Sequence, residues 1–245
     1  MDASPPPAAA ADPAFRADVL AGLAAPIPAI PARWLYDRRG SELFEAITDL
    51  PEYYLTRTER ALLERHSPDV AHLAGTGDAV VEFGSGSSAK TPILLRAMKD
   101  TLGVGAFLLI GMDRIKDEAV LIRAYDDAAG ITAAFNLNLL HRINAELDGD
   151  VPIDAFRHRA IWNDDLSRIE MHLEALRDVS FNISGRPFSF RAGATIHTEN
   201  SHKYGHRDSR ILLRAAGWGV VREWTDDASW FSIVLAEAEP PRFAP

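Results

Sequence analysis

The feature that most constrains the fold is a glycine-rich turn between a predicted strand and a predicted helix. Residues 79–83 form a short β-rich run that ends in the turn 84–88 (GSGSS), and a helical pattern follows at 90–98. Strand, glycine turn and helix in this order are typical of the opening of a nucleotide-binding α/β domain. The glycines let a ligand approach the backbone, and the first turn of the helix presents free amide groups to it.

Three kinds of ligand are considered for this turn: a nucleotide bound by a Walker A loop, a dinucleotide and S-adenosylmethionine. A Walker A loop requires a glycine where Ala89 stands, and no hydrophobic strand ends in a convincing partner aspartate. A dinucleotide site has Ala89 in the third glycine position. The order Glu82-x-Gly84-x-Gly86 suits S-adenosylmethionine better, because the acid and the open turn then contact an amino acid moiety and a ribose. An ordinary strand–helix turn that binds no ligand remains an alternative interpretation.

The composition excludes several classes of protein. The 245 residues include 26 Lys and Arg and 35 Asp and Glu, which gives a net charge of −9, and there is no Cys. The chain therefore has neither disulfides nor Cys-ligated metal. Without a run of basic residues an acidic chain is not expected to bind nucleic acid. No apolar run is long enough to span a membrane, and residues 1–13 are a Pro/Ala-rich leader expected to be disordered. A cytoplasmic protein that acts on small molecules is the resulting expectation.

Hydrophobic periodicity predicts the remaining elements. Helices are expected at about 15–23, 42–48, 56–66 with 70–73, 117–129, 132–147 and 207–216. Thr56 and Glu59 have the spacing of a capping box at the start of the third helix. Strands are expected at 105–111, 220–224 and 231–236. From residue 156 onward the alternation has period two with turn signals, which predicts an antiparallel sheet.

Polar side chains gather in the segment 196–204 (IHTENSHKY), which is read as a loop. Glu199 can accept from an azole or another N–H group, and Ser201 can donate or accept beside it. The spacings of the three histidines between 197 and 206 do not place them on one helical face, so no metal is expected. A solvated loop is the simpler alternative. Tyr53 and Tyr125 each lie close to acidic residues, and tyrosine hydroxyls are good donors to carboxylates.

Six ordered blocks of sequence together resemble one family, the histidine-specific Nα-methyltransferases of ergothioneine biosynthesis. The resemblance runs from about residue 14 to 236 and is carried by the blocks 34–44, 50–59, 82–91, 124–136, 168–171 and 197–203. It implies an α/β fold in which a methyltransferase-type Rossmann domain is joined to an α+β substrate-binding domain. The substrate domain would comprise 14–60 and 116–206, and the cofactor domain 61–115 and 207–238.

The resemblance also implies roles for individual residues. Gly84 and Lys90 would contact the cofactor, S-adenosylmethionine, and Tyr36 would lie near the substrate amine as the catalytic residue. The residues implied to bind histidine are Tyr53 and Tyr125 for its carboxylate, Glu199 and Ser201 for its imidazole, and Asn200 and Met171 beside the imidazole. The product would be trimethylhistidine (hercynine), and the enzyme is expected to be a monomer without nucleic acid or membrane partners.

One part of the family pattern is missing. Residues 99–105 connect the helix after the glycine turn directly to a strand that the family reaches only after three further strand units. At the size of a βαβ motif, about 75 residues are absent, including central strands and the acid that binds the ribose. Asp113 is the next acidic residue at the end of a predicted strand after the glycine turn, so its position would allow it to replace that acid. The family pattern instead assigns Asp113 to a later strand, and this assignment is preferred. The alternative to an active enzyme is therefore an impaired or inactive remnant that folds or binds histidine without methyl transfer.

Overall fold

The computed structural model describes residues 12–74 and 105–240. The predicted strand, glycine turn and helix at 79–98, with Gly84 and Lys90, lie outside the described residues. The rest is an α/β structure that divides into two compact units. Unit 1 contains the described residues within 1–45, 129–159 and 171–199, and unit 2 those within 46–128, 160–170 and 200–245. No described helix is long and apolar enough to cross a membrane.

These compact units are not the ranges predicted for the two functional domains. The segments 46–60 and 116–128 were assigned to substrate, yet they belong to the same unit as most of the residues assigned to cofactor. A compact unit is defined by contacts and a functional domain by its ligand. The assignment of each ligand to its ranges therefore stays a prediction.

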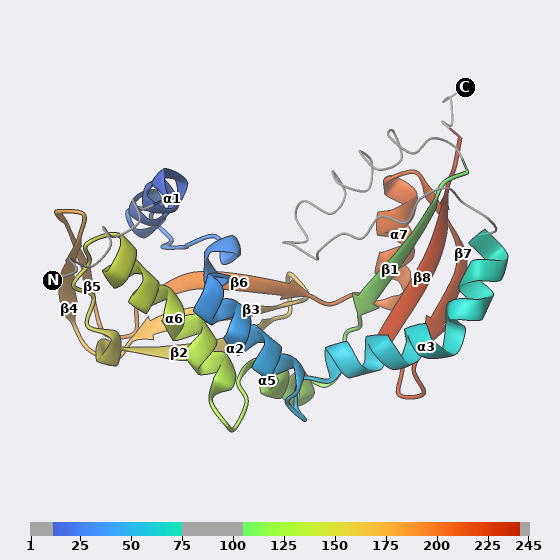
Figure 1. Ribbon diagram of the computed structural model, residues 1–245, viewed down its shortest axis with the longest axis horizontal. Coiled ribbons are helices and arrows are strands. Elements are labelled where there is room, and N and C mark those ends of the chain that lie inside the picture. Colours follow the sequence, from blue (N-terminus) through green and yellow to red (C-terminus); the bar gives the residue numbers. More distant parts are fainter. Residues whose placement is uncertain (1–11, 75–104, 241–245) are drawn as a thin grey trace, which may run out of the picture. The chain divides into compact units, whose positions relative to one another are not determined.

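Unit 2 is built on a three-stranded sheet in the order β1-β8-β7 (Figure 1). Strand β8 (Phe231–Ala238) lies in the centre, antiparallel to both β1 (Phe107–Asp113) and β7 (Trp218–Thr225). The sequence of β8 is almost continuously apolar because it is buried on both faces, as expected for a central strand.

Two helices cover opposite faces of this sheet. Phe231 and Ile233 of β8 pack with Leu62 of α3 (Tyr54–Ala74). The alternate β8 residues pack with α7 (His206–Ala215) in a second cluster that contains Trp218. Since successive side chains of a strand point to opposite faces, this division places α3 and α7 on the two sides of the sheet.

Helix α3 differs from its prediction. It begins at Tyr54, two residues before the expected capping box at Thr56, and continues without interruption to Ala74. Pro68 lies inside it and removes one backbone hydrogen bond, and one residue earlier Ser67 Oγ donates to the Leu63 carbonyl. Packing of the apolar face of the helix on the sheet outweighs the local cost of the proline.

Unit 1 contains helices α1 (Pro13–Leu23) and α6 (Ile131–Glu146), the short helices η1 (Ala32–Leu35) and η3 (Ile153–Ala155), and most of α2 (Arg38–Thr48). Strands β4 (Val179–Ile183) and β5 (Arg186–Phe190) form an antiparallel hairpin. Its turn residues Ser184 and Gly185 have φ values of 51° and 74°. This confirms the turn predicted there, because tight hairpins require left-handed backbone.

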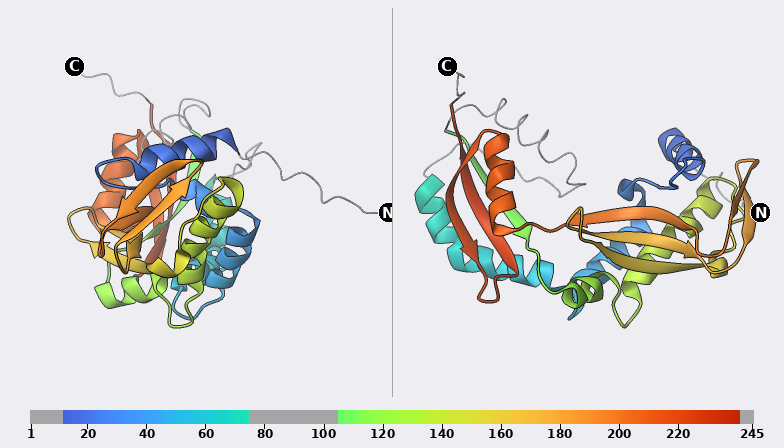
Figure 2. Two further views of the ribbon diagram at one scale, coloured as in Figure 1. Left: turned by 90° about the vertical axis from the view of Figure 1, so that its left-hand side faces the viewer. Right: turned by 180° about the vertical axis from the view of Figure 1, so that it is seen from behind.

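A second sheet has the strand order β2-β3-β6, and Figure 2 shows its strands side by side. The strands are β2 (Phe156–Asn163), β3 (Arg168–Ala175) and β6 (Thr195–His202). The expectation of a loop over 196–204 is wrong for most of that segment, which forms β6. The polar composition concealed the alternation: Ile196 and Thr198 are buried, whereas Thr195, His197 and Glu199, which alternate with them, are only partly covered.

A buried amide joins helix α6 to the strands of unit 1. Asn136 is fully buried, and its Nδ2 lies 3.0 Å from His158 Nδ1 of β2 and donates to the His172 carbonyl of β3 over 3.1 Å. Its Oδ1 accepts from Thr198 Oγ1 of β6 over 2.7 Å. A single side chain therefore fixes α6 against three strands, including the one that carries Glu199.

We expect Asn136→Ala to lower the free energy of unfolding by about 3 kcal/mol, because it leaves buried hydrogen-bonding groups without partners. The exposed Asn182, which bonds Asp150 over 3.2 Å, provides the control, and Asn182→Ala should cost less than about 1 kcal/mol. Urea denaturation measures both values. Equal losses in the two variants would contradict the anchoring role of Asn136.

Candidate active site

The predicted site residues fall in both units. Unit 1 contains Tyr36, Met171 and Glu199, and unit 2 contains Tyr53, Tyr125, Asn200 and Ser201. The two predicted cofactor residues lie outside the described residues.

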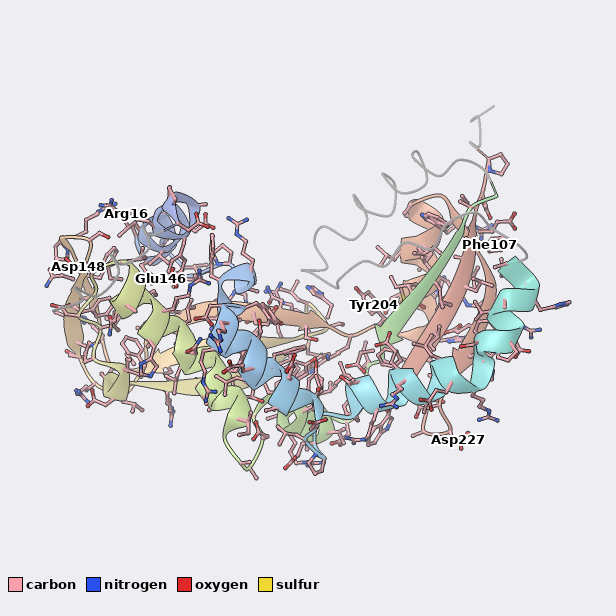
Figure 3. The ribbon with its side chains drawn as sticks, in the orientation of Figure 1. Arg16, Phe107, Glu146, Asp148, Tyr204 and Asp227 are labelled. Carbon is pink, nitrogen blue, oxygen red and sulfur yellow. The ribbon has the colours of Figure 1, made fainter. Side chains whose placement is uncertain are left out.

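In unit 2 the segment after β6 lies beside the end of β1. Tyr204 N donates to the Asp113 carbonyl over 2.9 Å, and Ile115 N donates to the Tyr204 carbonyl over 3.2 Å. Figure 3 shows Tyr204 next to the end of β1, opposite to the end marked by Phe107. This pairing places the side chain of Lys203, one residue earlier, against the side chain of Asp113.

Asp113 is the centre of a buried polar cluster. Both of its carboxylate oxygens accept from Tyr54 Oη, at 2.9 and 2.8 Å. Lys116 Nζ donates to Oδ1 over 2.5 Å, and Lys203 Nζ lies 2.7 Å from Oδ2. All four side chains are almost completely buried. A buried charge needs such partners, and two ammonium groups here surround one carboxylate.

Lys203 connects this cluster to two predicted substrate residues. Its Nζ donates to Tyr125 Oη over 2.9 Å and to Ser201 Oγ over 2.8 Å. The two hydroxyls lie 2.6 Å apart, and the ring of Tyr53 meets that of Tyr125 edge-on at 5.9 Å. Tyr125 ends α5 (Glu118–Tyr125), which is shorter than predicted because the chain leaves the helix at Asp126. The structure thus brings Tyr53, Tyr125 and Ser201 together.

This cluster is suited to an anionic oxygen ligand. Within it Lys116 and Lys203 carry one more positive charge than Asp113 neutralises, and the hydroxyls of Tyr125 and Ser201 lie on the Lys203 side. Hydroxyl donors beside an excess of buried positive charge favour a carboxylate. Asn200 precedes Ser201 in β6 and is partly buried.

Asp113 does not fit the role of a replacement ribose acid. A ribose-binding carboxylate must offer free oxygens to two hydroxyl donors, and both oxygens of Asp113 already accept from Tyr54 and the two lysines. This supports the alignment, which assigns Asp113 to a later strand. Sequence reasoning missed Tyr54, Lys116 and Lys203. For Lys203 a signal was present: it follows Glu199 and Ser201 at intervals of two, the spacing of one strand face.

The predicted residues of unit 1 are placed on different elements. Tyr36 follows η1, is 44% exposed, and contacts the rings of Phe44 and Phe135 edge-on, each at 5.4 Å. Met171 is buried in β3, where its carbonyl accepts from Thr198 Oγ1 over 3.0 Å. The Glu199 carbonyl accepts from His197 Nε2 over 3.0 Å, and the Glu199 side chain projects from β6 on the strand face of Ser201.

Burial shifts the pKa of two groups in the Asp113 cluster. Burial first, and the negative charge of Asp113 second, raise the pKa of Tyr54 far above its ordinary value of 10.0. Burial lowers the pKa of Lys116 from 10.5 to about 8, against the opposing attraction of Asp113 and with the help of Lys203. The charge of Lys116 therefore changes near pH 8.

The lowered pKa of Lys116 predicts that stability rises with pH. Above pH 8 the unfolded chain binds more protons at this lysine than the folded chain does, so the free energy of unfolding rises by about 1.5 kcal/mol between pH 8 and about pH 9.5. Above pH 10 the raised pKa of Tyr54 acts in the opposite direction. Urea denaturation of the wild type and Lys116→Met across this range should give diverging curves. Parallel curves would show that Lys116 does not titrate there.

Comparison with known proteins identifies the family of this chain. The chain matches the family described as histidine-specific methyltransferase, SAM-dependent, over residues 15–103 and 95–238. It is 34% identical to the histidine N-alpha-methyltransferases of Mycolicibacterium smegmatis and Mycobacterium tuberculosis, with 91% of this chain and 94% of each relative covered. It is 25% identical to ergothioneine biosynthesis protein 1 of Neurospora crassa, with 80% of this chain and 32% of that protein covered.

The mycobacterial alignments extend over 304 positions, although the chain has 245 residues. At least 59 aligned positions (304 less 245) therefore have no residue in this chain. The family match itself spans nearly the whole chain, and the identity to two full-length relatives exceeds 30%. The chain belongs to the family of S-adenosylmethionine-dependent, histidine-specific methyltransferases.

Proposed function

We propose that the chain transfers methyl groups from S-adenosylmethionine to the α-amino group of L-histidine and yields trimethylhistidine, the first step of ergothioneine biosynthesis. Family membership supports the reaction class and the cofactor. The names of the mycobacterial relatives support histidine as the substrate. The enzyme would act as a monomer in the cytoplasm on small molecules alone.

The observation that carries this proposal is the hydroxyl pair of Tyr125 and Ser201 held by the buried ammonium of Lys203. Tyr53 and Tyr125 would bind the carboxylate of histidine. Glu199 lies two residues before Ser201 on the same strand, and these two side chains would bind the imidazole of histidine. Asn200 and Met171 would line the imidazole side, and Tyr36 would lie near the amine.

The residues of this site would position the substrate amine rather than activate the methyl donor. S-adenosylmethionine, when bound, supplies a methyl group that is already activated by its sulfonium charge. The chain must then hold the amine in line with that methyl group and exclude water. An α-amino group has a pKa near ~8, so its neutral form is accessible without a strong base. Two-ended binding of histidine, by its carboxylate and its imidazole, would fix the amine between them.

We also propose that the Rossmann domain lacks central strands that the relatives contain. The positions without a residue in the mycobacterial alignments support this, as does the family match in two pieces that meet near residue 100. The substrate domain would comprise 14–60 and 116–206, and the cofactor domain 61–115 and 207–238, with Gly84 and Lys90 in the turn that holds the cofactor.

Glu199→Gln tests the imidazole contact. We expect kcat/KM for histidine to fall about 10- to 100-fold, because a charge-assisted hydrogen bond contributes about 1.5–3 kcal/mol. The KM for S-adenosylmethionine should stay within twofold. Mass spectrometry of methylated histidine, with single-turnover sampling, measures the rates.

The control for this substitution is Glu237→Gln, which makes the same change at an exposed position of β8 and should retain the wild-type rate. The absence of methylated histidine from folded wild-type protein at any enzyme concentration would reject the proposed activity. A Glu199→Gln enzyme with unchanged kcat/KM would reject the role of Glu199 alone.

Calorimetric titration with S-adenosylmethionine tests the shortened cofactor domain. We expect the dissociation constant to be at least tenfold higher than that of the M. smegmatis relative measured side by side, because part of the pocket lining is absent, and tenfold corresponds to about 1.4 kcal/mol. Equal affinities would show that the missing segment does not contribute to cofactor binding. Histidine binding without cofactor binding would identify an inactive remnant.

A further inference from the structure

A cavity of about 660 Å³ lies in unit 2 between the start of α7 and the edge strand β7. Figure 1 shows α7 along the sheet that contains β7. Arg114, which follows β1, and Ser229, in the turn before β8, complete the lining. The volume is that of a pocket for a small molecule. None of the residues proposed to bind histidine lines this cavity.

The wall that β7 contributes departs from a regular strand. Four consecutive residues line the cavity: Val220, Val221, Arg222 and Glu223. In a regular strand only every second residue would face it. The register of β7 against β8 shifts between Val220 and Arg222, as it does at a β-bulge. Because a bulge redirects the side chains around it, Arg222 lines the cavity together with Glu223.

Glu223 is the buried acid of the cavity, and its side chain is 6% exposed. Arg210 Nη2 donates to Oε2 over 3.3 Å, whereas Arg114 Nη1 and His206 Nδ1 lie 4.0 and 3.6 Å from Oε1. The last two distances are too long for hydrogen bonds, and Oε1 is buried without such a bond to the described residues. Glu223 thus gathers three basic side chains around the cavity without satisfying their donors.

Arg114 is the base that the protein satisfies least. Its side chain is 15% exposed, and among the described residues its guanidinium contacts only Glu223, over 4.0 Å. A guanidinium has five N–H donors, and donors that are largely buried need acceptors. A ligand with several acceptor oxygens in the cavity would supply them.

The lining of the cavity carries an excess of two positive charges when His206 is neutral. Arg114, Arg210 and Arg222 line it, and Glu223 is the only acid among its lining residues in the described part of the chain.

The acids of the adjacent turns do not cancel this excess. Asp208 Oδ2 accepts from the Gly205 amide over 3.1 Å, and Asp226 Oδ1 accepts from the amides of Trp230 and Phe231, each over 2.7 Å. Neither aspartate lines the cavity. Their carboxylates stabilise the local backbone instead.

We infer that this cavity binds a phosphate dianion, either free or as the phosphate group of a small monoester. The dianion matches the excess charge, and guanidinium groups bind its oxygens through paired hydrogen bonds. The hydroxyls of Thr225 and Ser229 also line the cavity, and exposed Val221 offers an apolar surface to the organic part of a monoester. The inference goes beyond the proposed function and does not depend on it.

Calorimetric titration with phenyl phosphate and with inorganic phosphate tests the inference. The measurements use about pH 7.5, where the monoester is a dianion, and about 0.15 M NaCl, which screens exposed charges. We expect phenyl phosphate to bind with a dissociation constant below about 1 mM. Arg114→Gln and Arg222→Gln should each weaken binding about tenfold or more, because each removes a charged donor group.

The matched control is Arg60→Gln. Arg60 is an exposed arginine of α3, the helix on the other face of the same sheet, and it pairs with Glu64 over 2.9 Å. Its substitution makes the same change in charge and should leave the dissociation constant within about twofold. Equal losses in Arg60→Gln and Arg222→Gln would show general attraction to a basic surface and overturn the inference.

Two further results would also overturn it. One is the absence of saturable binding by folded wild type up to about 10 mM phenyl phosphate. The other is competition between histidine and phenyl phosphate, which would place the anion in the histidine site. The comparison of the two probes identifies the source of the phosphate: tighter binding of phenyl phosphate supports a monoester, and equal binding supports free phosphate in the same cavity.

The test remains decisive if Arg114→Gln does not fold, as judged by circular dichroism. Arg222 and Val221 are both exposed, so changes there are not expected to unfold the chain. Val221→Glu introduces a negative charge at the cavity and should weaken phenyl phosphate binding about tenfold or more. Wild-type affinity in folded Arg222→Gln or Val221→Glu would overturn the inference.

Discussion

The ion pair between Lys203 and Asp113 is the interaction on which the candidate site depends. An isolated buried charge is far more costly than a paired one, and this contact gives the buried ammonium of Lys203 a carboxylate partner. The backbone pairing of Tyr204 with the end of β1 brings the two together, and the pair then holds the hydroxyls of Tyr125 and Ser201. The fold of unit 2 and the chemistry of the site are thus linked through one buried contact.

Each unit uses a buried polar group to fix part of the same strand. In unit 1 Asn136 joins α6 to Thr198 of β6, and in unit 2 Lys203 fixes Ser201 near the end of that strand. Apolar packing is tolerant of small shifts, whereas hydrogen bonds in a buried environment require defined distances and directions. Such anchors suit a strand whose side chains Glu199 and Ser201 are proposed to bind a small polar ligand.

The predictions from sequence succeeded where a local pattern was strong. Most helices, the apolar strand β8 and the hairpin turn at Ser184 and Gly185 are confirmed, because periodicity and turn chemistry act over a few residues. They failed where tertiary contacts override the local signal. The polar segment that forms β6 was read as a loop, and α3 was expected to be interrupted between residues 66 and 70. Sheet pairing stabilises the first, and packing on a sheet stabilises the second.

The sequence by itself determined the family and the α/β class, since ordered motif blocks and residue chemistry are properties of the chain alone. Only the tertiary structure decided that Lys203 and Asp113 meet, because the two residues are 90 positions apart and join through the alignment of β1 with the segment after β6. No local pattern encodes that contact. The direction of the hydrogen bonds in the site follows from the contact and is therefore also a product of the fold.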